Sequence, residues 1–189
     1  MTLKNEDFYD ADGTFLVDKA KQAYYDMMER FGYPVVDRLR GEEFWAVDFN
    51  LGDFVHAGMA GILWWNDEEG GFLGHEIFLL PGQMIVEHGH DETSATPAKL
   101  EAWHVRHGMI YTLGEGEPTD PMPVELPASQ AGHITVNHAD PVYPGEVARL
   151  NRKMAKHFMI AGSEGAIVTE DGSYHDGEAL RFTNPGVAF

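Results

Sequence analysis

From residue 45 onward, short apolar runs alternate with turn-forming residues, and this pattern restricts the chain to a small set of folds. Each run is four to eight residues long and rich in β-branched and aromatic side chains, which is typical of strands. Glycine, proline, asparagine and aspartate stand between the runs. The runs are residues 62–65, 75–80, 83–90, 100–107, 109–113, 133–136 and 165–169. Short strands without intervening helices predict an all-β sandwich or barrel.

Ahead of these runs, residues 17–31 follow the period of an amphipathic helix, and Gly32 ends it. The apolar positions with this spacing are Val17, Ala20, Tyr24, Met27, Met28 and Phe31. We expect residues 1–44 to form a helical segment that packs on a barrel of residues 45–189, as one structural domain. The irregular pattern of residues 145–156 also allows a second helix.

Charge and cysteine content exclude several classes of protein. The formal net charge of -18 disfavours binding to nucleic acid or to anionic membrane surfaces. The absence of cysteine removes disulfides, thiolate ligands and a cysteine nucleophile. The polar start MTLKNEDFYD lacks an apolar signal region, and no long apolar run is present. We therefore expect a cytoplasmic protein without nucleic-acid or membrane partners.

The most informative chemistry lies between residues 82 and 108. Residues two apart on a strand point to the same face, so His88 and His90 direct their imidazoles into one space. Glu101 opens the next expected strand, and an antiparallel return would bring its carboxylate beside the two rings. Two imidazoles and one carboxylate form a ligand set that leaves positions open for water or substrate. The pattern therefore predicts a metal site.

The spacing around these residues resembles the first sequence motif of the cupin superfamily. Five residues separate Gly82 from His88, and six separate Glu101 from Gly108, as in that motif. The departure is the stretch of ten residues between His90 and Glu101, which is longer than in most cupins. The resemblance implies a single cupin barrel of the jelly-roll type, with the N-terminal helix packed on it.

A second cupin motif implies a fourth ligand, a histidine on a later strand. His157 lies before the expected strand 166–170, where a cupin places this ligand. The approach from Gly145 lacks the usual proline and glycine of the motif, so this backbone departs from the pattern. His133 and His138 are the competing candidates.

A closer resemblance is to the D-lyxose isomerase family of cupin sugar isomerases, and it spans about residues 50–185. The segments that carry it are EIFLLPGQMIVEHGH, KLEAW, GEGEPT, GAIVTE and FTNP. It implies conversion of D-lyxose to D-xylulose, with D-mannose to D-fructose as a second reaction, by a homodimer. It implies His88, His90, Glu101 and His157 as ligands of one divalent ion. Manganese is favoured, with iron, cobalt, zinc and nickel as alternatives.

Two further residues could supply the proton transfers that such an isomerisation needs. Lys99 stands two residues before Glu101 and so shares its inward face. Burial beside a dication would disfavour its charged form, which would let it relay protons. Glu170, at the end of the strand after His157, is the second candidate acid or base.

Three residues are candidates for contact with the sugar. Trp103 shares the face of Glu101 by parity, so we expect it in the barrel interior, as core or as an apolar wall for the substrate. Asp176 and Arg181, near the end of the chain, could bind sugar hydroxyls. Parity also places His107 on the inner face, although it is not added to the ligands.

Three other functions compete with a sugar isomerase. A cupin phosphosugar isomerase would need basic residues to hold a phosphate, and the few lysines and arginines form no evident cluster. A cupin dioxygenase would bind iron(II) with similar ligands. A non-catalytic sugar-binding cupin would lack proton-transfer groups, whereas Lys99 and Glu170 are both present.

Overall fold

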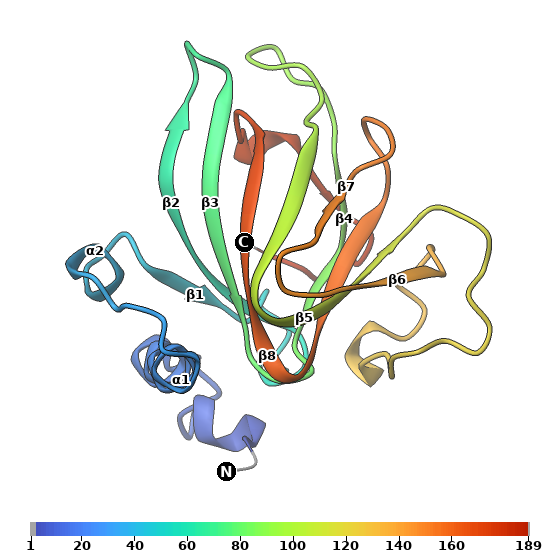
Figure 1. Ribbon diagram of the computed structural model, residues 1–189. Coiled ribbons are helices and arrows are strands. Elements are labelled where there is room, and N and C mark those ends of the chain that lie inside the picture. Colours follow the sequence, from blue (N-terminus) through green and yellow to red (C-terminus); the bar gives the residue numbers. More distant parts are fainter. Residues whose placement is uncertain (1–2, 189) are drawn as a thin grey trace.

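The computed structural model describes residues 3–188, which form a nine-stranded antiparallel sheet that curls into an open barrel (Figure 1). The strands are β1 (Trp45–Val47), β2 (Met59–Asp67), β3 (Phe72–Leu79), β4 (Met84–His90), β5 (Glu101–Gly114), β6 (His138–Val142), β7 (Val147–Arg149), β8 (His157–Ser173) and β9 (Leu180–Phe182). The helical elements are α1 (Val17–Phe31) and α2 (Asp37–Arg40), with 3-10 turns η1 (Asn5–Phe8), η2 (Ala128–Gln130) and η3 (Gly177–Ala179). The predicted all-β cupin barrel with an N-terminal helix is confirmed.

Strand β8 holds the barrel together because it pairs with three other strands. Its second half pairs with β3 from Leu79↔Ala166 onward, and its first half pairs with β4 up to His88↔His157. Along its other edge it pairs with β5, between Glu101↔Gly172 and Gly114↔His157. The long β5–β8 ladder therefore links strands that are far apart in the sequence.

The helix α1 has the bounds that the sequence predicts, and it lies on the outer face of the sheet (Figure 1). Its buried residues are Ala20, Tyr24, Met27 and Met28. They pack in one apolar cluster with Phe44 and with Phe78 of β3. The helix therefore stabilises the barrel wall by burial of apolar surface. Gly32 ends the helix in the left-handed conformation, with φ 66°. No helix within residues 3–188 has the length and apolarity to cross a membrane.

Two expected elements differ from the structure. Residues 145–156 do not form a helix. Instead β7 pairs with residues 102–104 of β5, whose edge offers unpaired backbone groups to this segment. Residues 133–136 do not form a strand, because the backbone N–H groups of Thr135 and Val136 donate to the carboxylate of Glu87, and β6 begins only at His138.

The contact between Gly108 and Gly165 provides a test of the β5–β8 ladder. Gly108 has φ +69°, and an added Cβ would lie 1.9 Å from the carbonyl oxygen of Gly165. Gly108→Ala should lower the free energy of unfolding by about 3 kcal/mol or more, because it combines left-handed strain with steric overlap. Urea unfolding followed by circular dichroism measures this loss.

Gly71→Ala is the matched control, because Gly71 has φ +71° and no atom within 4 Å of an added Cβ. Its free energy of unfolding should fall only by the cost of the left-handed conformation, about 1–2 kcal/mol. An equal loss in the two variants would show that the close approach in the ladder contributes nothing.

Candidate metal centre and active site

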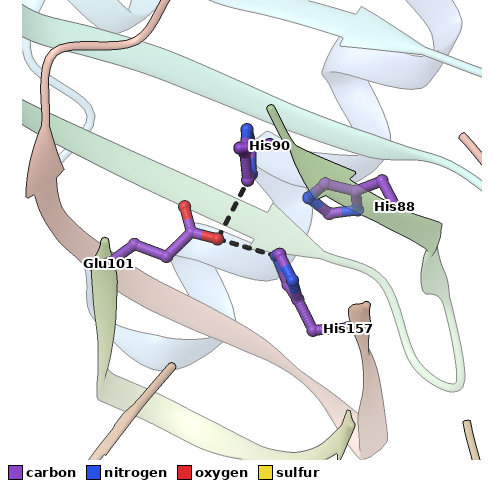
Figure 2. A group of neighbouring side chains, drawn as sticks. All are labelled: His88, His90, Glu101 and His157. Atoms are coloured by element: carbon purple, nitrogen blue, oxygen red, sulfur yellow. Dashed lines mark ion pairs between the residues drawn. The ribbon is translucent and has the colours of Figure 1, made fainter. Parts of the chain in front are cut away.

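Four side chains from three strands converge inside the barrel. His88 and His90 come from the end of β4, Glu101 begins β5 and His157 begins β8. Figure 2 shows their polar ends directed at one another, and the four candidate ligand atoms all lie within 4.8 Å of each other. The alternation of β4 turns both of its histidines inward, and pairing of His88 with His157 brings the third ring alongside. The β5–β8 ladder supplies the carboxylate.

Backbone carbonyls fix the orientation of two of the rings. Nδ1 of His88 donates to the Val86 carbonyl at 2.9 Å, and Nδ1 of His157 donates to the Ala155 carbonyl at 2.9 Å. A carbonyl can only accept, so each Nδ1 carries the proton and each Nε2 keeps its lone pair for the shared space. This is the arrangement that metal-binding imidazoles usually have.

The atoms that face this space lack hydrogen-bond partners in the protein. Nε2 of His90 and Nε2 of His157 lie 3.3 and 2.7 Å from Oε1 of Glu101. All three atoms are buried, and none has a hydrogen bond of acceptable geometry. Buried polar atoms without partners are costly, and a cation would compensate all three at once. The residues present therefore fit a metal ion.

The charge states also suit a cation. Burial and the two neighbouring imidazoles hold the pKa of His88 well below its usual value, so the ring is neutral. Burial alone would raise the pKa of Glu101, but the Lys99 ammonium together with His157 and His90 outweighs burial and holds this pKa well below its usual value. Neutral imidazole and ionised carboxylate are the forms that bind metals. The group can hold one divalent ion.

The competing candidates for the fourth ligand lie elsewhere. Nδ1 of His138 donates to the Glu117 carbonyl, and its Nε2 lies 3.0 Å from Asp140 on an exposed part of the surface. His133 lies in the segment before β6 and outside the four-residue group. Of the three histidines considered for this position, the structure brings only His157 to the group.

Lys99 lies between two buried carboxylates. Its Nζ is 2.6 Å from Oε2 of Glu101 and also donates to Oε1 of Glu170. Burial alone would lower the pKa of Lys99, but the two carboxylates outweigh it and the pKa is raised. The expectation that the charged form of Lys99 is disfavoured is therefore wrong. Strand parity indicates that Lys99 lies near Glu101, but it does not reveal Glu170 as a second carboxylate partner. Lys99 links the candidate metal group to Glu170.

The predicted substrate contacts fall into two groups. Trp103 is buried beside His157, with ring centroids 5.3 Å apart, and it lines the cavity next to the four-residue group. Asp176 and Arg181 are not among the residues that line this cavity. Asp176 accepts a hydrogen bond from Thr93, and Arg181 pairs with Asp91 at 2.9 Å. Both therefore hold the loop between β4 and β5.

His107 does not lie on the inner face that parity predicts. Its ring stacks on Phe31 at 5.4 Å and contacts Tyr33, both of which belong to the outer cluster. The register of β5 against β8 shifts between Val105 and His107, and this irregularity turns His107 outward.

Two histidines in the cavity escaped the sequence analysis. His75 of β3 lies 3.6 Å from Oε2 of Glu170 through its Nδ1. The backbone of His175 exchanges two hydrogen bonds of 2.8 Å with the side chain of Asn66. Burial and the Lys99 ammonium lower the pKa of His175 to about 4, so its ring is neutral. The alternation of side chains along β3 could have indicated that His75 faces the cavity. No sequence pattern marks His175.

The cavity has the size and lining of a small-molecule site. Its volume of about 130 Å³ leaves room for roughly ten water-sized groups, which is the size class of a monosaccharide. Its walls are mostly apolar, and they include Trp45, Phe49, Trp103 and Phe182. Lys99 is the one lysine in the lining, which contains no arginine. The fold and this inner site together define a protein of the cupin class.

Comparison with known proteins narrows this class. No family model matches the sequence. The chain is 31% identical over 140 residues to the D-lyxose ketol-isomerase of Cohnella laeviribosi, which covers 74% of this chain and 75% of that protein. It is 29% identical over 171 residues to the D-lyxose/D-mannose isomerase of Thermosediminibacter oceani, and the aligned residues cover 90% of this chain and 92% of that protein. The chain belongs to the D-lyxose ketol-isomerase family and is an aldose–ketose isomerase.

Solved structures share the fold at low identity. The L-ribose isomerase of Cellulomonas parahominis has a TM-score of 0.69 and 14% identity, with 89% of this chain and 91% of that chain covered. The L-ribose isomerase of Acinetobacter sp. DL28, solved with L-ribose, has a TM-score of 0.70 and 12% identity, with 90% and 92% covered. At these identities the likeness shows the fold alone.

Removal of the carboxylate from the four-residue group tests it as a metal site. We expect Glu101→Gln to bind Mn²⁺ at least about 10–100-fold more weakly, because the anionic ligand is lost and even supporting residues have effects of this size. Isothermal titration with Mn²⁺ measures the affinity. Glu76→Gln is the control, since Glu76 is buried on β3 but contacts Trp64 and Thr169 instead of the histidines. Equal affinities in the two variants would exclude Glu101 as a ligand.

Proposed function

We propose that this protein is a divalent-metal-dependent isomerase that converts D-lyxose to D-xylulose, with D-mannose to D-fructose as a second reaction. The observation that carries the proposal is the Lys99–Glu170 pair, which joins the candidate metal group in a cavity of monosaccharide size. The names of the relatives support the choice of sugars.

His88, His90, Glu101 and His157 would hold the ion, with Mn²⁺ as the favoured metal and Fe²⁺, Co²⁺, Zn²⁺ and Ni²⁺ as alternatives. When bound, such an ion polarises sugar oxygens and stabilises the negative charge that develops on them. The lone pairs of His88 and His157 are oriented before an ion arrives, so binding requires little rearrangement of these two rings.

The Lys99–Glu170 pair supplies acid–base groups of suitable charge. Burial alone would raise the pKa of Glu170, but the Lys99 ammonium and His75 together outweigh burial, and the pKa is lowered. Glu170 is therefore an ionised base, able to take a proton from one sugar carbon and return it to the neighbouring carbon. The ammonium of Lys99 has three donors, and two of them face carboxylates. The third can donate to a sugar oxygen as negative charge develops there.

The apolar cavity favours an unphosphorylated sugar over a phosphosugar. A phosphate group needs cationic partners, and the lining offers Lys99 alone, which two carboxylates already engage. The acid–base pair beside the candidate metal group likewise favours catalysis over simple sugar binding. An iron dioxygenase needs no such pair, so that alternative leaves Lys99 and Glu170 without a role.

The first test is ketose formation by the Mn²⁺-loaded protein from D-lyxose, D-mannose and D-glucose 6-phosphate. We expect D-xylulose and D-fructose from the first two sugars and no product from the phosphosugar. Removal of the metal with a chelator should abolish turnover, and Mn²⁺ should restore it. Ketose from the phosphosugar alone, or unchanged activity after chelation, would contradict the proposal. Oxygen consumption by the Fe²⁺ form would instead indicate a dioxygenase.

Substitutions of the buried pair test its catalytic role. We expect Lys99→Met and Glu170→Gln to lower kcat for D-lyxose by roughly 10²–10⁴-fold, the usual contribution of a positioned acid or base. Loaded with saturating Mn²⁺, both variants should carry the metal content of the parent, measured by mass spectrometry, because neither residue belongs to the candidate ligands. Glu76→Gln should keep full activity. A variant of the pair with full activity would remove that residue from the mechanism.

Two further features stay predictions. The resemblance to cupins implies a homodimer, and light scattering of the purified protein measures its mass. A cytoplasmic location fits a cysteine-free chain, and fractionation of cells that express the protein would test it.

A further inference from the structure

Glu170 is contacted from two sides, and only one contact has a place in the proposed mechanism. Lys99 donates to Oε1, whereas Nδ1 of His75 lies 3.6 Å from Oε2. The backbones of His75 and Glu170 face each other in the β3–β8 register, so the two side chains are direct cross-strand neighbours. Both are buried, with side-chain exposures of 10% and 9%. The carboxylate is therefore enclosed between an ammonium and an imidazole.

The sheet holds the His75 ring in one position. Trp45 stacks on it with ring centroids 5.7 Å apart and an interplanar angle of 28°. Gly61, which pairs with Trp45 across β1 and β2, makes room for both rings. A Cβ at Gly61 would lie 2.5 Å from Nε2 of His75 and 2.6 Å from the indole of Trp45. Three neighbouring strands thus form a slot that fits this imidazole.

The chemistry of the slot indicates more than apolar packing. Nε2 of His75 is buried without a hydrogen-bond partner, and such an atom costs stability that an apolar side chain would not cost. Among the described residues, Glu170 provides the one carboxylate within 4 Å of a nitrogen of this ring. The 3.6 Å separation is longer than a hydrogen bond, and contacts of this kind commonly shorten when substrate closes the site.

We propose that His75 is a positioning residue that holds the Glu170 carboxylate in the orientation needed for proton transfer. The inference rests on the proposed function, because it assumes that Glu170 is the base. With Lys99 at one oxygen and His75 at the other, the carboxylate cannot rotate about its terminal bond without losing a partner. Each oxygen keeps a second lone pair for the substrate. His75 acts through Glu170, and among the described residues it has no hydrogen bond or ion pair with a candidate metal ligand.

Two substitutions of nearly equal size separate polarity from packing. Asn at position 75 places its amide nitrogen close to the position of Nδ1, whereas Leu offers a methyl group there. We expect His75→Leu to lower kcat for D-lyxose by about tenfold or more, the effect of losing one polar contact to a charged group. His75→Asn should recover most of this loss. KM and Mn²⁺ content should stay at parental values in both variants.

Other outcomes would overturn the inference. Equal kcat values for the Leu and Asn variants would show that the polar contact is irrelevant. A raised KM with unchanged kcat would make His75 a substrate-binding residue instead. Loss of Mn²⁺ from both variants would make its role structural.

A change at Gly61 tests the slot while His75 itself stays intact. Gly61→Ala should displace the His75 ring and lower kcat as His75→Leu does, with the metal content unchanged. Gly74→Ala is the matched control, because its Cβ would lie 2.5 Å from the indole of Trp65, which is 55% exposed and outside the cavity lining. It should keep the parental kcat. Parental kcat in Gly61→Ala would overturn the role of the slot.

The double variant distinguishes this inference from the proposed function. In a Glu170→Gln background, His75→Leu should cause no further loss of kcat, because its effect passes through the carboxylate. If Glu170→Gln alone keeps full activity, the proposed base is wrong. If Glu170→Gln is impaired and His75→Leu lowers kcat by the same factor in both backgrounds, only the positioning role fails.

Discussion

The backbone ladder between β5 and β8 fixes the distances on which the site depends. Glu101 begins one of these strands, and the other carries both His157 and Glu170. Because the register of the ladder is set by backbone hydrogen bonds, the carboxylate, the imidazole and the second carboxylate cannot move independently. Lys99 then bridges the two carboxylates, so the charges of the acid–base pair and of the candidate metal group compensate each other. The sheet thereby holds three charged or ligating groups in a mostly apolar cavity, and Lys99 joins them from the residue pair just before β5.

The parts of this arrangement that depend on local geometry could be predicted from the sequence. The alternation of a strand is enough to place His88 and His90 in one space, and an antiparallel return is enough to bring Glu101 beside them. The helix α1 was predictable for the same reason, since its apolar period and its terminal glycine are both local signals. The position of His157 depended on a family resemblance, because nothing in the residues before it specifies the β4–β8 register.

The parts that could not be predicted depend on partners from distant segments. A bulge in β5 turns His107 outward, and no pattern in the sequence marks its position. The charge of Lys99 depends on Glu170, which another strand brings into place. Residues 145–156 form β7 because an edge of β5 is available to pair with them. His75 was overlooked because its significance lies in a contact across the sheet.

The long connection between β4 and β5 shows how little the site depends on distance along the chain. Loop-closure entropy rises only with the logarithm of length, so each doubling costs about 0.6 kcal/mol. The pairs Asp91–Arg181 and Thr93–Asp176 fasten the loop to β9 and to the segment before it, and they offset part of that cost. The two ends of the loop stay where the strands hold them, whatever its length. The stretch of this loop ahead of Lys99 is therefore the part of the barrel wall that can vary in length and composition while the geometry of the buried groups is preserved.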